Sequence, residues 1–191
     1  MSRTPKKEFI KIPADSVGFF KEFSEEVAFE FQISKREKQL LELLVYHGFQ
    51  NKQLARLLEI TEKTVKNHIT SILSKTKTNS TRELQSFMLR VLIDTDEEKT
   101  TKMLERHIKL AAEDTGLSNR ETEILEVIVK YGYQSQGIAE HFTISQKTVL
   151  NHISEVLRKT DSYSTRELLS TFFRDIFREQ ATNVETSDTA S

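Results

Sequence analysis

The stretch Lys-Thr-Val-Lys-Asn-His-Ile occupies residues 63–69 and returns, with one change, as Lys-Thr-Val-Leu-Asn-His-Ile at residues 147–153. The similarity extends in both directions from this stretch. Residues 33–92 align without gaps to residues 117–176, and 26 of the 60 aligned positions are identical. Self-similarity of this length at a fixed offset of 84 residues predicts a duplicated structural unit rather than one large domain.

Each copy is expected to form four short helices. In the first copy Ser34 precedes an apolar segment with helical spacing, and Glu37 follows three residues later, which is the pattern of a capping box. Gly48 suits the left-handed end of that helix. Three further helices are expected at about residues 51–58, at about 62–75, and from residue 80 or 81 onwards. The second copy repeats these features 84 residues later.

The composition favours an all-α protein of the cytoplasm. Charged residues make up 30% of the chain, which has five Gly, two Pro and no Cys, so a disulfide framework and Cys-ligated metal sites are excluded. No apolar run approaches the ~18 residues of a membrane span. The net charge of −1 hides an asymmetry, because residues 1–94 carry +4 and residues 95–191 carry −5. This asymmetry favours a polyanionic partner on the first half.

The third expected helix has the chemistry of a helix that enters the major groove of DNA. A short helix, a tight turn and a second helix with an outward polar face form the helix-turn-helix arrangement. Val65, Ile69 and Ile72 would face the core. The polar side chains left outside are Lys63, Thr64, Lys66, Asn67, Thr70 and Ser71. Lysine can bind phosphates or guanine edges, and Asn and Thr supply hydrogen bonds to bases or to the backbone.

Three strings together closely resemble the LuxR/GerE-type helix-turn-helix domain: Ser-x-Arg-Glu, Gly-Phe-Gln-Asn-Lys-Gln-Leu-Ala and Ile-Thr-Glu-Lys-Thr-Val-Lys-Asn-His. The resemblance implies two tandem four-helix domains, sequence-specific binding of double-stranded DNA and control of transcription. It also implies that the third helix is the recognition helix. The fourth helix in this family often pairs two domains on a two-fold DNA site.

Positions implied to lie at DNA occur in both copies. In the first copy they are Asn51, Lys52, Lys63, Thr64, Lys66, Asn67 and His68, and in the second they are Lys147, Thr148, Asn151 and His152. The second copy has less charge, because Leu150 stands where the first copy has Lys66, and Ser135 and Gln136 replace its Asn51 and Lys52. Each phosphate contact adds salt-dependent affinity, so we expect the first copy to anchor the protein and the second to add register or specificity.

The segments around the repeats are expected to be helical as well. Apolar stripes over about 15–31 and 96–113 predict a helix before each copy. The expected domains are a tail and leading helix (1–32), the first helix-turn-helix domain (33–93), a linker helix (94–116), the second helix-turn-helix domain (117–180) and a disordered tail (181–191). About 32 residues before the first copy are too few for a phospho-acceptor domain, so we expect control by expression level or by a regulatory protein.

Several apolar or charged groups allow two interpretations. The Phe stripe over residues 19–31 would pack within the chain or bind a partner. The last helix carries apolar residues nearly all round, namely Leu168, Leu169, Phe172, Phe173, Ile176 and Phe177, and would pack on residues 84–92 or on another chain. The basic residues Arg3, Lys6, Lys7 and Lys11 would form a solvated terminus or an arm that reaches a DNA groove.

No catalytic set, metal site or cofactor is expected. The five His are scattered, no H-E-x-x-H spacing occurs, and no nucleophile–base pair or phosphate-binding Gly loop is present. Three function classes stay open: a transcription regulator on the nucleoid, which we favour, an accessory DNA-binding factor of a mobile element, and a protein-interaction module whose second copy no longer binds DNA. The chain would act as a monomer that mimics a dimer, or as a homodimer held by the last helix or the spacer helices.

Overall fold

The computed structural model describes residues 17–93 and 96–188, with side chains described for 20–93 and 96–182. Over these residues the chain forms ten α-helices and no strand, so the predicted all-α fold is confirmed. None of these helices is long and apolar enough to cross a membrane. The helices are α1 (Val17–Glu30), α2 (Lys35–His47), α3 (Asn51–Leu57), α4 (Glu62–Thr76), α5 (Thr81–Ile93), α6 (Glu97–Thr115), α7 (Asn119–Tyr131), α8 (Ser135–Phe142), α9 (Gln146–Lys159) and α10 (Thr165–Asp188).

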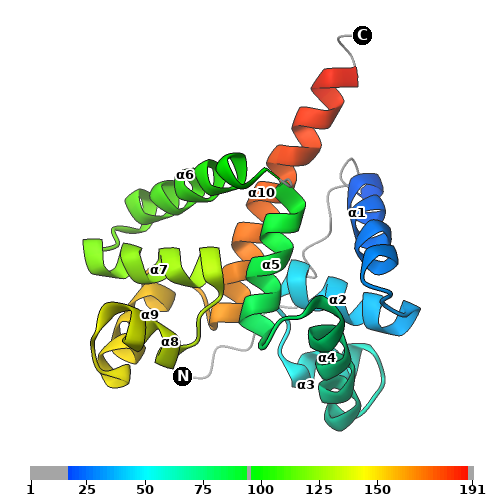
Figure 1. The fold of residues 1–191 in the computed structure, drawn as a ribbon, viewed down its shortest axis with the longest axis horizontal. Helices are drawn as coiled ribbons and strands as arrows, with labels where there is room; N and C mark the ends of the chain where they lie inside the picture. Colours follow the sequence, from blue (N-terminus) through cyan, green and yellow to red (C-terminus); the bar gives the residue numbers. More distant parts are fainter. Residues whose placement is uncertain (1–16, 94–95, 189–191) are drawn as a thin grey trace.

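Two four-helix units follow the duplicated sequence, with α2 to α5 in the first and α7 to α10 in the second (Figure 1). The Ser34 side chain accepts a hydrogen bond from the Glu37 backbone N–H, and the Glu37 carboxylate accepts one from the Ser34 N–H at 2.7 Å. Gly48 ends α2 in the left-handed conformation, with φ of 67°. The same roles fall to Ser118, Glu121 and Gly132 in the second unit. The capping boxes and glycine stops are thus where the sequence predicts them.

Within each unit the first three helices share a small core. α4 packs on α2 and α3, and α9 packs on α7 and α8 in the same way. Fully buried side chains at this junction include Leu40, Leu44, Val65 and Ile72 in the first unit, and their counterparts in the second unit are Ile124, Ile128, Val149 and Val156. Because the same four positions are buried in both units, the duplication preserves the packing as well as the helices.

The fourth helix of each unit packs mainly against the other unit. α10 lies along α5 and α2, and α5 also packs on α7. Figure 1 shows the α5–α10 pair between the two units. The apolar residues that nearly encircle α10 are all buried within the chain: Leu168, Leu169, Phe172, Phe173, Ile176 and Phe177. Of the two partners predicted for this helix, the structure therefore shows residues 84–92 of the same chain.

A glycine at the end of each first helix allows this close packing. A Cβ atom added at Gly132 would lie 2.4 Å from the Cα of Glu83, at the start of α5. A Cβ atom added at Gly48 would lie 2.7 Å from the Cα of Glu167, at the start of α10. Real Cβ atoms do not approach backbone this closely, so the two glycines are required by the contact between units as well as by their positive φ.

Arginines of the fourth helices reinforce the docking of the units. Arg174 Nη1 donates a hydrogen bond to the Tyr46 carbonyl oxygen at 2.8 Å, and the corresponding Arg90 Nη1 donates to the Lys130 carbonyl oxygen. The last carbonyls of a helix lack intrahelical partners, and the helix dipole favours cations there. Each arginine therefore caps the first helix of the other unit.

The leading helices cover the outside of this arrangement. α1 packs on α2, and α6 packs on α7 and α5. The Phe20 ring centroid lies 4.9 Å from that of Tyr46 and 5.5 Å from that of Phe177, so α1 also reaches α10. Phe29, by contrast, is 87% exposed. Packing within the chain thus holds for part of the predicted Phe stripe, while the side chain of Phe19 lies outside the described ones.

The last helix is longer than the sequence predicts. α10 continues to Asp188, so the prediction of disorder from residue 181 is wrong for residues 181–188. This segment has neither Gly nor Pro to end the helix. At its start Ala181 is buried, and the preceding Gln180 donates from Nε2 to the Ile93 carbonyl oxygen at 3.5 Å. The rest of the predicted disordered tail, residues 189–191, lies outside the residues that the structure describes. So do the basic residues of the predicted N-terminal arm, Arg3, Lys6, Lys7 and Lys11.

Replacing Gly132 by Ala tests the contact between the units. Gly116 is a matched control, because its φ is also positive, at 65°, but a Cβ added there meets nothing within 4 Å. We expect Gly116→Ala to cost roughly 1–2 kcal/mol of unfolding free energy for the left-handed conformation. Gly132→Ala should cost roughly 1–3 kcal/mol more for overpacking. Urea denaturation measures both losses, and equal losses would contradict the close approach.

Candidate nucleic-acid interface

Hydroxyl groups fix the start of the third helix in each unit. Thr61 Oγ1 accepts a hydrogen bond from the Thr64 N–H at 3.1 Å, and the two hydroxyl oxygens lie 2.9 Å apart. Ser145 Oγ accepts from the Thr148 N–H at 3.0 Å, with the hydroxyl oxygens 2.7 Å apart. The predicted site residues Thr64 and Thr148 therefore take part in the helix caps, and only their remaining hydrogen-bonding capacity is left for a ligand.

The outer face of α4 carries positive charge that the protein does not neutralise. Lys63, Lys66 and Asn67 are exposed, whereas Val65 and Ile69 of the same helix are buried. Among the described residues, neither lysine ammonium group forms a hydrogen bond or an ion pair. The structure thus leaves three of the predicted site residues of α4 open to a ligand.

The outer face of α9 has the same layout with less charge. Lys147 and Asn151 are exposed, and Leu150, at the position of Lys66, is 49% exposed. The guanidinium of Arg158 lies 2.8 Å from a carboxylate oxygen of Glu155 on the same helix. That pair neutralises charge on α9, so Lys147 carries most of the free positive charge on this face.

The second helix of each unit adds to the difference in charge between the units. Lys52 and Arg56 are exposed one turn apart on α3. The corresponding residues of α8 are Gln136 and Glu140, which are joined by a hydrogen bond of 3.1 Å. Arg56 was not among the residues predicted from the sequence, although the alignment of the two copies pairs it with an acidic residue. The contrast in charge between the units is therefore larger than α4 and α9 alone indicate.

Three predicted site residues are less open than the lysines. Asn51 is half-buried, and its Oδ1 accepts a hydrogen bond from Arg166 Nη1 of the other unit at 3.1 Å. The Asn51 side chain can then bind a phosphate only by donating hydrogen bonds from its amide N–H groups. His68 and His152 are also half-buried, so only part of each ring is open to a ligand.

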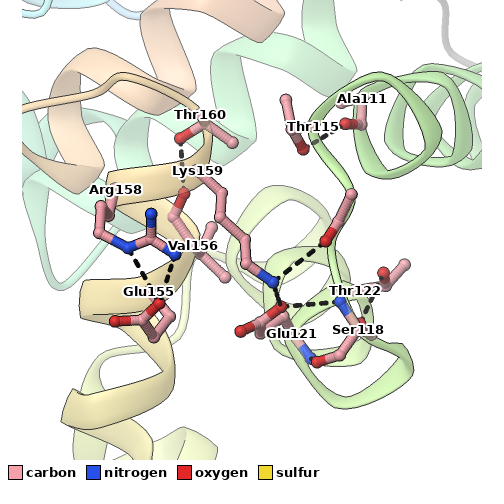
Figure 2. Close-up of polar contacts among 11 residues, drawn as sticks. Ala111, Thr115, Ser118, Glu121, Thr122, Glu155, Val156, Arg158, Lys159 and Thr160 are labelled. Carbon is pink, nitrogen blue, oxygen red and sulfur yellow. Dashed lines mark hydrogen bonds and ion pairs between the residues drawn. The ribbon is translucent and has the colours of Figure 1, made fainter.

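An ion pair repeated in both units ties the end of the third helix to the start of the first. Figure 2 shows the pair in the second unit, where Lys159 Nζ lies 2.7 Å from Glu121 Oε2 and donates to the Gly116 carbonyl oxygen at 3.0 Å. The same carboxylate oxygen accepts from the Ser118 N–H at 2.7 Å. The hydrogen bonds from Lys159 and Ser118 lower the pKa of Glu121 to about 2. This contact sets where α9 ends relative to α7.

The first unit contains the same ion pair. Lys75 Nζ lies 2.7 Å from Glu37 Oε2. Burial raises the pKa of Glu37, but hydrogen bonds from Lys75, Ser71 and Ser34 outweigh burial and lower the pKa to about 2. Both α4 and α9 are therefore held at their C-terminal ends by a buried carboxylate, while their N-terminal ends are left open to a ligand.

The predicted site residues gather in two groups, one in each unit. Figure 1 shows α3–α4 and α8–α9 on opposite sides of the central α5–α10 pair, toward the end at which α5 and α10 begin. Gln50 Nε2, just before α3, donates to Ser164 Oγ, just before α10, at 2.9 Å. In the other direction Arg82 Nη1 of α5 donates to the Tyr133 carbonyl oxygen, just before α8, at 2.6 Å. These bonds place each second helix against the fourth helix of the other unit.

Comparison with known proteins agrees with this geometry. A capped helix with a polar outer face, braced by a shorter helix, defines the helix-turn-helix class. Residues 32–88 and 115–171 each match the family described as bacterial regulatory proteins, luxR family. Because the two matches together cover more than half of the sequence, the chain belongs to this family of DNA-binding regulators.

A curated relative of the chain carries the name "Uncharacterized response regulatory protein YgeK" and comes from Escherichia coli (strain K12). It is 39% identical over 61 residues, which are 32% of this chain and 41% of the relative. The chain thus matches less than half of that relative's length. No solved structure matches the chain.

The repeated ion pair predicts a defined dependence of stability on pH. The pKa of Glu121 falls from 4.5 to about 2 on folding, so its contribution is fully present above about pH 4.5 and is lost as the pH falls toward 2. We expect Glu121→Gln to lower the unfolding free energy by roughly 2 kcal/mol at pH 7 and by less at pH 3. Chemical denaturation at the two pH values measures this difference.

Glu123→Gln is the control for this test. Glu123 is exposed and its carboxylate lies 2.7 Å from Arg120 on the same helix, so its loss should cost at most about 0.5 kcal/mol at either pH. A loss for Glu121→Gln that stays the same at pH 7 and pH 3 would contradict the assignment.

Proposed function

We propose that the protein is a sequence-specific, double-stranded-DNA-binding transcription regulator in which one chain supplies both halves of a helix-turn-helix pair. One observation supports this most: the fourth helices of the two units pack on each other within the chain. Domains of this family often pair through that helix on two-fold DNA sites. Each unit would then present its third helix to one major groove, with half-sites about one helical turn apart.

The covalent connection makes a second chain unnecessary for the pair. The apolar face of α10 is buried against α5 and α2, so the surface that would join two chains is already used. Once the first unit is bound, binding of the second is intramolecular and has a high effective concentration. The simplest complex is therefore one chain on one composite site.

The two units would contribute differently to binding. The first unit exposes four basic side chains, those of Lys52, Arg56, Lys63 and Lys66. At the four corresponding positions of the second unit, only Lys147 is basic. Counterion release makes affinity depend on the number of phosphate contacts, so the first unit would supply most of the affinity. Amide side chains can read adenine, and both units keep one, at Asn67 and Asn151.

Particular features of the structure would also suit three alternative functions. The exposed Leu150 and the neutralised pair of Arg158 and Glu155 would suit a second unit that binds protein instead of DNA. The exposed Phe29 of α1 would suit a homodimer or a regulatory protein on the leading helix. An accessory factor of a mobile element would use the same DNA chemistry, and the genomic position of its sites would distinguish it from a regulator.

Selection of bound sites from random duplex DNA tests the proposal. We expect wild-type protein to enrich a two-part motif. Lys63→Ala/Lys66→Ala should lose one half of the motif, and Lys147→Ala/Asn151→Ala should lose the other half. A single short motif that is insensitive to the second pair would make the first unit the only reader, and no enrichment would refute the DNA-binding regulator.

The salt dependence of affinity for the selected site tests the unequal roles. Removing two phosphate contacts should reduce the slope of log K against log salt by roughly 1.8 for Lys63→Ala/Lys66→Ala. The second-unit double variant should change the slope by roughly half as much. Lys102→Ala/Lys109→Ala removes two exposed charges from α6 and should leave the slope unchanged. A larger effect from the second unit would contradict the assignment.

A further inference from the structure

A polar pocket of about 270 Å³ lies where the two units meet. Its lining is almost symmetric, because most lining residues occur in pairs separated by 84 positions. Arg82 and Arg166 form one such pair, and Gln50 and Gln134 form another. The serines and threonines that start α5 and α10 complete the wall, together with Gln85. No acidic residue lines the pocket.

The two arginines bring positive charge into this space without a carboxylate to balance it. Arg82 Nη2 donates to Thr165 Oγ1 at 3.2 Å, and Arg166 Nη2 donates to Thr81 Oγ1 at 3.3 Å. Each guanidinium thus reaches across to the helix start of the other unit. Among the described residues neither forms an ion pair, and burial lowers the pKa of both arginines. Both arginines are half-buried, and each also donates to a backbone carbonyl oxygen, Arg82 to that of Tyr133 and Arg166 to that of Phe49. These bonds do not balance the two like charges, whereas an anion between the guanidinium groups would.

Two further features of the wall suit an oxyanion. α5, α8 and α10 all begin at the pocket, so the positive ends of three helix dipoles point toward it. Gln85 is 2% exposed, and its Oε1 accepts no hydrogen bond from the described residues. An anion that carries a proton, such as hydrogen phosphate, has an O–H group that can satisfy this oxygen.

We propose that this pocket binds a phosphate-type oxyanion that links the two units through Arg82 and Arg166. The anion would offset the repulsion between the guanidinium groups and so stabilise the docked arrangement of the units. This site is separate from the recognition helices and does not require the proposed transcriptional role. The phosphate would be free in solution or belong to bound DNA. A DNA phosphate is a possible source because the start of α9 lies near the pocket: Gln146 Nε2 donates to Ser135 Oγ, next to the lining residue Gln134, at 2.8 Å.

The first experiment measures the thermal midpoint of the free protein in sodium phosphate and in sodium chloride of the same ionic strength. Gln134→Glu is the test variant, because the arginines also hold the units together and their loss could unfold the protein. Gln134 makes no side-chain cap to α8, so the new carboxylate is free to pair with the guanidinium groups. Gln32→Glu makes the same charge change at an exposed position between α1 and α2, which lies outside the pocket and has no side-chain hydrogen bond among the described residues.

We expect phosphate to raise the midpoint of wild type and of Gln32→Glu by several degrees in a saturable way. Gln134→Glu should have a higher midpoint than wild type in chloride and should gain nothing from phosphate. The proposal is overturned if phosphate and chloride act alike on wild type. It is equally overturned if Gln134→Glu responds to phosphate as wild type does. Neither result depends on whether the protein binds DNA.

A second experiment distinguishes the two sources of phosphate. Affinity for the selected duplex is measured with increasing phosphate at fixed ionic strength. Competition in wild type that disappears in Gln134→Glu would place a DNA phosphate in the pocket. Unchanged or stronger DNA binding, together with the rise in midpoint, would assign the pocket to a free oxyanion.

Discussion

The packing of α5 against α10 is the contact on which the rest of the structure depends. Each of these helices ends one unit, yet its apolar face is covered by the other unit. Because each fourth helix packs on the other unit, glycine is required at positions 48 and 132, where any side chain would meet the backbone of the other unit. It also explains why Arg90 and Arg174 donate to carbonyl oxygens of the other unit's first helix. The two units therefore form one folded body.

Joining the pair in one chain allows the halves to differ. A symmetric homodimer must present the same side chains to both half-sites, whereas this chain presents Lys66 on one side and Leu150 on the other. The two units also differ in charge on their second helices, where Arg56 of α3 corresponds to Glu140 of α8. Affinity and specificity can thus be divided between two units whose caps, ion pairs and cores are nearly the same.

Much of the local structure follows from the sequence, because caps, glycine stops and helical periodicity act over a few residues. The start of α4 at Thr61 and the buried face of Val65 and Ile69 are examples. The sequence leaves the partner of α10 open between residues 84–92 and another chain, since an apolar helix does not specify which surface covers it. The pairing of Asn51 with Arg166 depends on the same docking. The continuation of α10 over residues 181–188 does not follow from the polar composition, which is typical of disorder, although no Gly or Pro stands there to end a helix.

The central claim is that one chain forms the complete DNA-binding pair, and the mass of its complex with DNA tests it most directly. Native mass spectrometry of the protein with a duplex that carries one selected two-part site gives the number of chains bound. The intrachain pair predicts one 22.2 kDa chain per duplex over a range of protein excess. Two chains per duplex as the smallest stable complex would contradict it.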